Sequence, residues 1–319
     1  MSFPARKISF FILKIIVALL VMILLIHRIS LDRLITSIRL ANLQWIFYSI
    51  LLLPVNLYLQ FIKWRLIVRR EVKTARNRQI AYSLLVGSAF GLITPGRLGD
   101  FARTLFISHA DWVRLMGLLT IDKFISLAVL YLLGIIGFSH FISLNLHLLI
   151  WFPILMITVF LAVLILVIIF RPFLLRDLVF YFHRKNSRFP ALDRFLKGIE
   201  MVTPQLTLRL SFFSMLQTLT YCLQLVFFVL AFENIRLWEG LVASFAVMFS
   251  KSLLPISLGD LGIRESAAVF FFGHFNISSA AAFNASFLLF TLNVLLPALL
   301  GLLLFLFKRY ISNSRMNGR

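Results

Sequence analysis

The chain has 319 residues, of which 61% are hydrophobic and only 14% are charged. A soluble domain is about half apolar and about a quarter charged. This chain has too few charged residues to cover its apolar surface in water, which indicates a polytopic membrane protein. The single cysteine, Cys222, excludes a disulfide-bonded secreted scaffold. The net charge of +20 lies in short segments between apolar runs, which is typical of membrane orientation and argues against a nucleic-acid partner.

Six apolar runs are long enough to cross a bilayer, because about 20 helical residues span its hydrocarbon core. We interpret the first run as a retained helix and not as a signal peptide, since it is long and lacks a small-residue cleavage site. The six predicted spans are Ile8–Ile26, Trp45–Val68, Trp112–Ser139, Leu148–Phe170, Thr207–Phe232 and Ala280–Phe307. Two further apolar runs, 80–107 and 238–275, are interrupted by glycine, proline and charged residues.

Basic residues predict the orientation of these spans. One cluster begins at Lys63 near the end of the second span, another fills the segment after Phe170, and a third ends the chain. The positive-inside rule places all three clusters and both termini in the cytoplasm. If either interrupted run crossed the membrane once, a later basic cluster would lie outside. We therefore expect both runs to be re-entrant helical hairpins, the first entering from the cytoplasm and the second from outside.

Two segments outside the spans have an amphipathic pattern. Residues 31–39 and 189–199 place apolar side chains on one helical face and basic side chains on the rest of the helix. They are either helices that lie on the bilayer or connecting helices packed on the protein. The second belongs to a cytoplasmic amphipathic segment of about residues 171–203. We treat residues 1–319 as one transmembrane domain.

A short motif recurs in the two interrupted runs. Pro-x-x-Leu-Gly-Asp occurs at residues 95–100 and again at 255–260, and an arginine follows each copy, Arg103 and Arg264. The flanking spans give two units of opposite predicted topology, about residues 45–139 and 207–307. Inverted repeats with broken helices are a transporter architecture. The predicted fold is thus an all-α polytopic membrane protein with six transmembrane helices and two opposed re-entrant hairpins; the alternative for the motifs is two unrelated turns.

The motif residues predict a binding site for a negatively charged group. Proline and glycine end one half-helix in each run, and Asp100 is expected to cap the next half-helix. A half-helix N-terminus presents free N–H groups, to which arginines add full positive charge suited to phosphate. The predicted substrate-binding residues are Arg97, Gly99, Asp100, Arg103, Lys123, Gly259, Asp260, Gly262, Arg264 and Glu265.

Charged residues at membrane depth allow a second interpretation. Each charge costs about 3 kcal/mol at a helix centre, so it must face water or form an ion pair. The charges either line a polar transport cavity or brace the hairpins as buried pairs, such as Asp100 with Arg103 or Arg264 with Glu265. The sequence contains no metal-ligand spacing and no recognisable nucleophile motif, so we predict no metal, no cofactor and no catalytic residue.

Both motifs also carry a resemblance to a known family. The stretch from Thr94 to Arg103 resembles the first signature of the lysylphosphatidylglycerol synthase transmembrane-region family, which is also described as flippase-like. The stretch from Leu254 to Glu265 resembles its second signature, a glycine-rich turn that ends in Gly-x-Arg-Glu. Trp64, between two basic residues, is similar to the family's pattern at the end of the second span. The resemblance covers nearly the whole chain, although Asp260 stands where the family often has glycine.

The resemblance implies lipid translocation, with polar or polyprenyl-linked lipids as the substrate class. Full-length synthases carry a soluble aminoacyl-transferase domain, and we expect no synthase activity here because the sequence has no such polar stretch. The leading hypothesis is a flippase or transporter for an anionic phospholipid or polyprenyl-phosphate-type lipid, in the plasma (inner) membrane of a prokaryote. The alternative is a non-transport subunit or scaffold that assists a lipid- or glycan-synthesis enzyme. The sequence leaves two protein partners open: such an enzyme, or a second copy of the chain.

Overall fold

The computed structural model describes residues 23–94, 97–145, 190–253 and 261–317, and the regular structure in these residues is helical. Four of its helical segments are long and apolar enough to cross a membrane: Leu43–Glu71, Trp112–Ser139, Pro204–Phe232 and Ser279–Lys308. They confirm four of the six predicted spans and establish an all-helical membrane protein. The predicted span Leu148–Phe170 lies outside the described residues, as does most of Ile8–Ile26.

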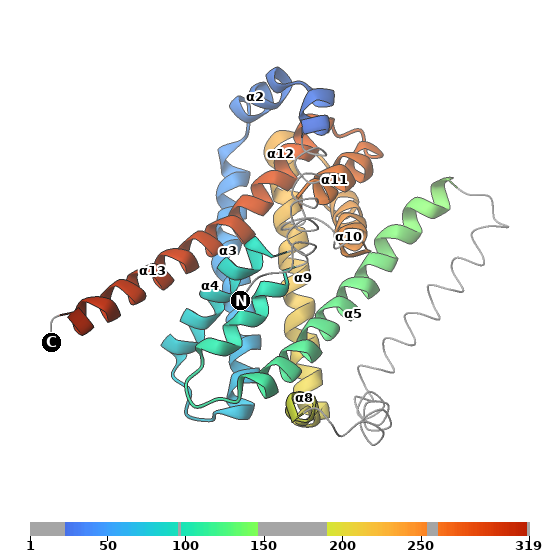
Figure 1. Ribbon diagram of the computed structural model, residues 1–319. Coiled ribbons are helices and arrows are strands. Elements are labelled where there is room, and N and C mark those ends of the chain that lie inside the picture. Colours follow the sequence, from blue (N-terminus) through green and yellow to red (C-terminus); the bar gives the residue numbers. More distant parts are fainter. Residues whose placement is uncertain (1–22, 95–96, 146–189, 254–260, 318–319) are drawn as a thin grey trace.

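Two of the long helices, α3 (Leu43–Glu71) and α9 (Pro204–Phe232), pack antiparallel along their length (Figure 1). At one end, the Asn42 N–H that precedes α3 donates to the Ala231 carbonyl at the end of α9, at 2.7 Å. At the other end, Arg70 Nη2 donates to Thr203 Oγ1, the N-cap of α9, at 3.0 Å. The side chains of Asn42 and Thr203 each accept a hydrogen bond from the first turn of the helix that follows. These hydrogen bonds tie the two antiparallel helices together at both ends.

Each interrupted run forms a pair of helices that folds back on itself. The first pair is α4 (Asn77–Ile93) and the 3₁₀ helix η1 (Leu98–Phe106), and Gln79 Nε2 joins their outer ends by donating to the Phe106 carbonyl at 3.1 Å. The second pair is α10 (Leu237–Leu253) and α11 (Ile263–Gly273), whose outer ends meet where the rings of Trp238 and Phe275 lie 6.2 Å apart. In each run, therefore, one helix ends and another begins around the predicted break, while residues 95–96 and 254–260 lie outside the described residues.

In each pair, the ends away from the connecting turn form its open end. The open ends of the two pairs lie toward opposite ends of the molecule (Figure 1). The first pair opens toward α8 (Pro190–Glu200), since Asp111, just beyond η1, forms an ion pair of 3.8 Å with Arg194 of that helix. The second pair opens toward α2 (Leu31–Arg39), where Leu34 and Ala280, just beyond the pair, share one apolar cluster.

Each helix pair also packs against a long helix from the other half of the chain. The second pair packs through α10 against α5 (Trp112–Asn145), and the first pair packs through α4 against α13 (Leu296–Asn317). Glycine permits both approaches. A Cβ on Gly137 of α5 would lie 2.7 Å from the Val242 carbonyl oxygen, and one on Gly301 of α13 would collide with the carbonyl of Leu85.

The last long segment is continuous but irregular. It consists of α12 (Ser279–Phe290), a π-helical turn η2 (Thr291–Leu295) and α13. The wide turn points Asn293 inward, where its Nδ2 donates to Gln224 Oε1 at 2.8 Å and its Oδ1 accepts from Asn56 Nδ2 at 2.5 Å. A π-turn of this kind often marks a functional position in a helix.

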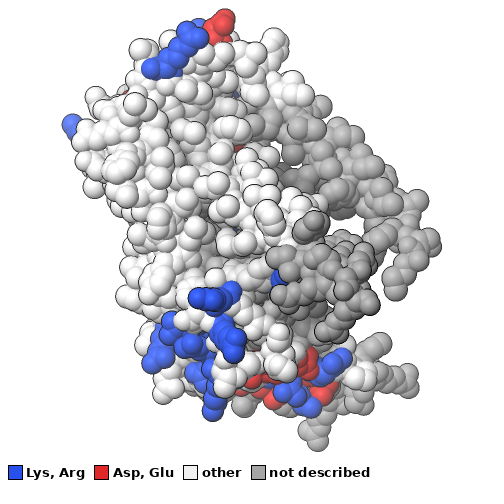
Figure 2. Space-filling model, turned by 90° about the vertical axis from the view of Figure 1, so that its left-hand side faces the viewer, with Lys and Arg blue, Asp and Glu red and all other residues white. Residues whose placement is uncertain are grey.

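The short amphipathic helices resolve differently from each other. Helix α2 buries Leu34, whose carbonyl accepts a hydrogen bond from Asn284 Nδ2. Leu31, Ile35 and Ile38 of the same helix are exposed. Helix α8 is packed on the protein, because a Cβ on Gly198 would collide with the backbone of Arg114 at the start of α5. Lysine and arginine gather toward the α8 end of the molecule, and a broad uncharged band covers the face shown in Figure 2.

Candidate functional site

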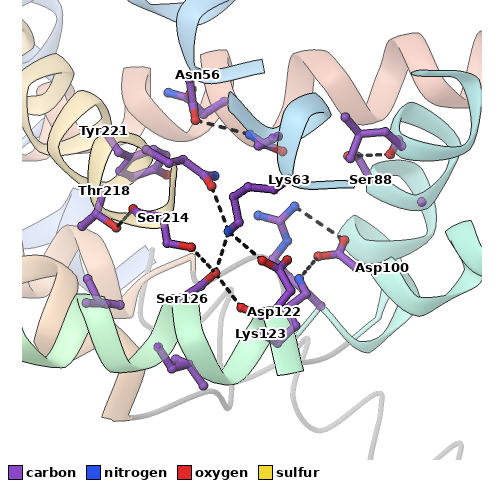
Figure 3. A pocket seen from close by; sticks show the side chains of 18 of the residues that line it. Asn56, Lys63, Ser88, Asp100, Asp122, Lys123, Ser126, Ser214, Thr218 and Tyr221 are labelled. Carbon is purple, nitrogen blue, oxygen red and sulfur yellow. Dashed lines mark hydrogen bonds and ion pairs between the residues drawn. The ribbon is translucent and has the colours of Figure 1, made fainter. Parts of the chain in front are cut away.

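A cavity of about 280 Å³ lies between α3, α4, η1, α5, α9 and the end of α10 (Figure 3). Among the described residues that line it, five are basic and two are acidic, so positive charge is in excess. These charged residues are Lys63, Arg97, Asp100, Arg103, Asp122, Lys123 and Lys251. They come from four helices, namely α3, η1 with its N-cap, α5 and α10, which only the tertiary fold brings together.

The inner part of the cavity is organised around Asp122 of α5. Its carboxylate pairs with Lys63 Nζ at 3.1 Å and with Arg103 Nη2 at 3.9 Å. Lys63 Nζ also donates to Ser126 Oγ at 2.7 Å and to Gln217 Oε1 of α9 at 3.4 Å. Because Lys63 and Asp122 are both about 5% exposed, this pair is desolvated and holds α3, α5 and α9 together at one point.

Arg103 is held in the cavity by stacking and by charge. Its guanidinium carbon lies 4.3 Å from the ring centroid of Trp64, within cation–π range. Trp64 is itself fully buried and donates from Nε1 to Ser83 Oγ at 2.8 Å. Within the described residues, Arg103 Nε is buried without a hydrogen-bond partner. The guanidinium is thus positioned by its neighbours and retains hydrogen-bonding capacity.

The outer part of the cavity is organised around Asp100 of η1. Lys123 Nζ donates to Asp100 Oδ2 at 2.5 Å, and Arg97 Nη2 lies 3.6 Å from Asp100 Oδ1. The Asp100 side chain is buried, whereas 39% of the Lys123 side chain and 30% of the Arg97 side chain are exposed. These two cations can therefore meet a ligand before the inner ones.

Neutral polar side chains complete the wall. Asn56, Gln60 and Lys63 recur at helical spacing along α3, and a matching stripe lies on α9. The α9 stripe consists of Ser214, Gln217, Thr218 and Tyr221. Neither stripe was predicted from the sequence, and the prediction that Lys63 belongs to the cytoplasmic cluster is wrong because its side chain is buried in the cavity. The polar spacing of i, i+4 and i+7 in an apolar helix is the signal that could have found them.

The second helix pair carries a separate buried cluster. Arg264 Nη2 donates to Glu265 Oε1 at 2.5 Å, and Arg264 Nε donates to Ser286 Oγ of α12 at 3.0 Å. The other Glu265 oxygen accepts the Gly262 N–H at 2.7 Å, and Gly262 has a left-handed φ of 85°. Both charged side chains are 0% exposed, and neither is among the described residues that line the cavity, which is compatible with the bracing interpretation of this pair.

The structure therefore brings together only part of the predicted site. Arg97, Asp100, Arg103 and Lys123 line the cavity, while Gly259 and Asp260 lie outside the described residues. Gly99 supports the turn, because its N–H donates to Thr94 Oγ1 at 2.5 Å and a Cβ would collide with the Phe90 carbonyl.

Two details predicted for Asp100 are wrong. It does not cap η1: that helix begins at Leu98, and Arg97, with a φ of 56°, occupies the preceding position. Nor is Arg103 its ion-pair partner, since the Asp100 carboxylate pairs with Lys123 and Arg97 instead. The carboxylate serves the cavity because its side chain points toward α5 and away from the backbone of its own helix.

Comparison with known proteins decides the family. Residues 11–301 match the family described as Lysylphosphatidylglycerol synthase TM region. The chain belongs to this family. Searches of curated proteins and of solved structures gave no significant match.

Membership of the lysylphosphatidylglycerol synthase transmembrane-region family adds to what the helices show. Together with the four long apolar helices, it identifies an integral membrane protein with a membrane lipid-related role. The matched range contains both copies of the Pro-x-x-Leu-Gly-Asp motif and the charged residues of the described cavity lining.

Proposed function

We propose that the protein moves a lipid with an anionic head group across the membrane. The observation that carries the proposal is the cavity, whose described lining has five basic and two acidic residues at membrane depth. Buried positive charge is costly, and the basic excess of the described lining would favour the entry of a phosphate. The lipid-related role of the family points to a lipid as the source of that phosphate.

In this proposal the head group enters the cavity while the acyl chains remain in the lipid. Arg97 and Lys123 contact it first, because their side chains are partly exposed and their shared partner Asp100 can be replaced by a phosphate. Arg103 receives the phosphate deeper in the cavity, where its guanidinium offers a planar fork for two oxygens. We propose transport over a reaction, because Lys63 Nζ, beside the Ser126 hydroxyl, is engaged in an ion pair with Asp122.

We further propose that the two helix pairs are opposed re-entrant hairpins of one inverted repeat within a six-span protein. Three features support this: the repeated motif, the opposite directions in which the pairs open, and their exchanged packing on α5 and α13. In such repeats, rocking of one half against the other exposes a central site alternately to the two sides. Cytoplasmic termini in a prokaryotic plasma membrane remain the orientation that the basic clusters predict.

Purified protein in liposomes tests the function. A fluorescent phosphatidylglycerol in the inner leaflet becomes accessible to an external quencher only if it is translocated. We expect the protein to accelerate the translocation of phosphatidylglycerol more than that of phosphatidylcholine. Arg103→Gln should slow it about tenfold, the effect of losing roughly one charge-assisted phosphate contact. Arg236→Gln is the matched control, since that arginine is 79% exposed and paired at the surface with Glu239.

The opposite result would favour the non-transport alternative. Folded protein that accelerates the translocation of neither lipid would indicate a subunit or scaffold for a lipid- or glycan-synthesis enzyme. Equal acceleration of both lipids, unaffected by Arg103→Gln, would show that the cavity charges do not select the substrate.

A further inference from the structure

A second recess lies on the outer surface of α3 and α9. It has a volume of about 680 Å³ and combines two arginines with aromatic and aliphatic side chains. Its lining is Tyr58, Ile62, Arg65, Leu66, Leu208, Arg209, Phe212 and Phe213.

This recess is distinct from the charged cavity, although the same two helices form both. Arg65 is two residues beyond Lys63 on α3, and Phe212 is two residues before Ser214 on α9. Two residues correspond to a rotation of about 200° around a helix. Lys63 and Ser214 line the cavity, so Arg65 and Phe212 face the opposite side of the two helices.

The two arginines stand together at one end of the recess. Arg65 precedes the end of α3 by about 9 Å of helix, and Arg209 follows the start of α9 by about 8 Å, on a rise of 1.5 Å per residue. Those two helix ends are joined by the hydrogen bond from Arg70 to Thr203. Both guanidiniums therefore lie within reach of the membrane interface on the same side.

Among the described residues, neither guanidinium has an acidic partner. Within the residues that the structure describes, Arg65 and Arg209 make no ion pair and no side-chain hydrogen bond. From this end the recess continues along the two helices, past Phe212 and Phe213, to Tyr58 about 10 Å further along α3. Positive charge at one end and an apolar floor beyond it match the division of a phospholipid into head and chain.

We propose that this recess is a binding site for an anionic phospholipid of the adjacent leaflet. Arg65 and Arg209 hold the phosphate between them, and one acyl chain lies along the aromatic and aliphatic floor. The aromatic side chains supply a rigid apolar surface at low entropic cost. Because the recess is on the far side of α3 and α9 from the cavity, this binding is independent of the proposed transport.

Photo-crosslinking in membranes tests the proposal at the level of residues. The full-length protein is placed in phosphatidylcholine bilayers with a trace of lipid that carries a diazirine on its acyl chain. We expect phosphatidylglycerol probes to label Tyr58, Phe212 and Phe213 several-fold more than phosphatidylcholine probes do. Arg65→Gln with Arg209→Gln should lower this labelling about tenfold, by loss of the phosphate contacts.

A matched control separates this site from general attraction of anionic lipid. Arg76→Gln with Arg78→Gln removes the same charge from two exposed arginines outside the recess, and labelling should stay within about twofold of the wild type. If the glutamine variant fails to insert, Arg65→Lys with Arg209→Lys keeps the charge but loses the fork, and should lower labelling about threefold. Equal labelling by both probes, or an equal loss in the control, would overturn the proposal.

Discussion

At the scale of the residue, the two arginines that follow the repeated motif have different surroundings. Arg103 lines the cavity and stacks on Trp64, whereas Arg264 is fully enclosed with Glu265 and Ser286. The repeat predicted equal roles, whereas the structure buries the two side chains to different degrees. A guanidinium with every side covered can brace a hairpin, while only one with an open side can meet a ligand.

This difference predicts opposite effects of the same substitution. Arg264→Gln leaves the Glu265 charge buried without its cation, and we expect the free energy of unfolding to fall by about 3 kcal/mol. Arg264→Gln with Glu265→Gln removes both charges and should recover part of this loss. The melting temperature in detergent measures both variants. An Arg264→Gln protein as stable as the wild type would show that the pair contributes little to the fold.

At the scale of the element, glycine determines how closely the helix pairs approach their partner helices. Gly301 of α13 has the backbone of Leu85 against it, and Gly273 at the end of α11 has open space around its Cα. Alanine favours a helix by about 1 kcal/mol over glycine at an unhindered position. The same methyl group costs about 1–3 kcal/mol where it forces two backbones apart.

We therefore expect Gly301→Ala to lower the melting temperature and Gly273→Ala to leave it unchanged or raise it slightly. Thermal denaturation of the two purified variants in the same detergent makes the comparison. Equal melting temperatures would mean that α4 and α13 can separate without cost, and that their contact does not hold the first helix pair in place.

Much of this level of structure could be predicted from the sequence. Apolar length located the helices around Trp45–Val68 and Thr207–Phe232, and proline and glycine located both breaks. The packing could not be predicted, because it depends on which faces meet. Asn56 and Asn293 are 237 residues apart, and only the π-turn brings their amides together. Lys63 was misplaced for the same reason, since counting charges along the chain ignores the direction in which each side chain points.

At the scale of the whole molecule, the direction of the helix pairs is the feature that a transport mechanism requires. The first pair opens beside α8 and the second beside α2, at opposite ends of the long helices (Figure 1). If the basic clusters set the orientation, the α8 end is cytoplasmic. Ser108, just beyond the first pair, is then inside, and Asn276, just beyond the second, is outside. Both residues are exposed, so each can report on its side.

Cysteine labelling tests this arrangement in intact cells. Cys222 is replaced by alanine, which suits a side chain that is 0% exposed in an apolar cluster. With Asn276→Cys added, a membrane-impermeant maleimide should label the protein from outside; with Ser108→Cys, it should label only after the cells are opened. Labelling of both from outside would place the open ends of the two pairs on one side and refute the inverted repeat. The exact reverse pattern would keep the repeat but invert the orientation, and would put the Arg65 and Arg209 recess in the outer leaflet.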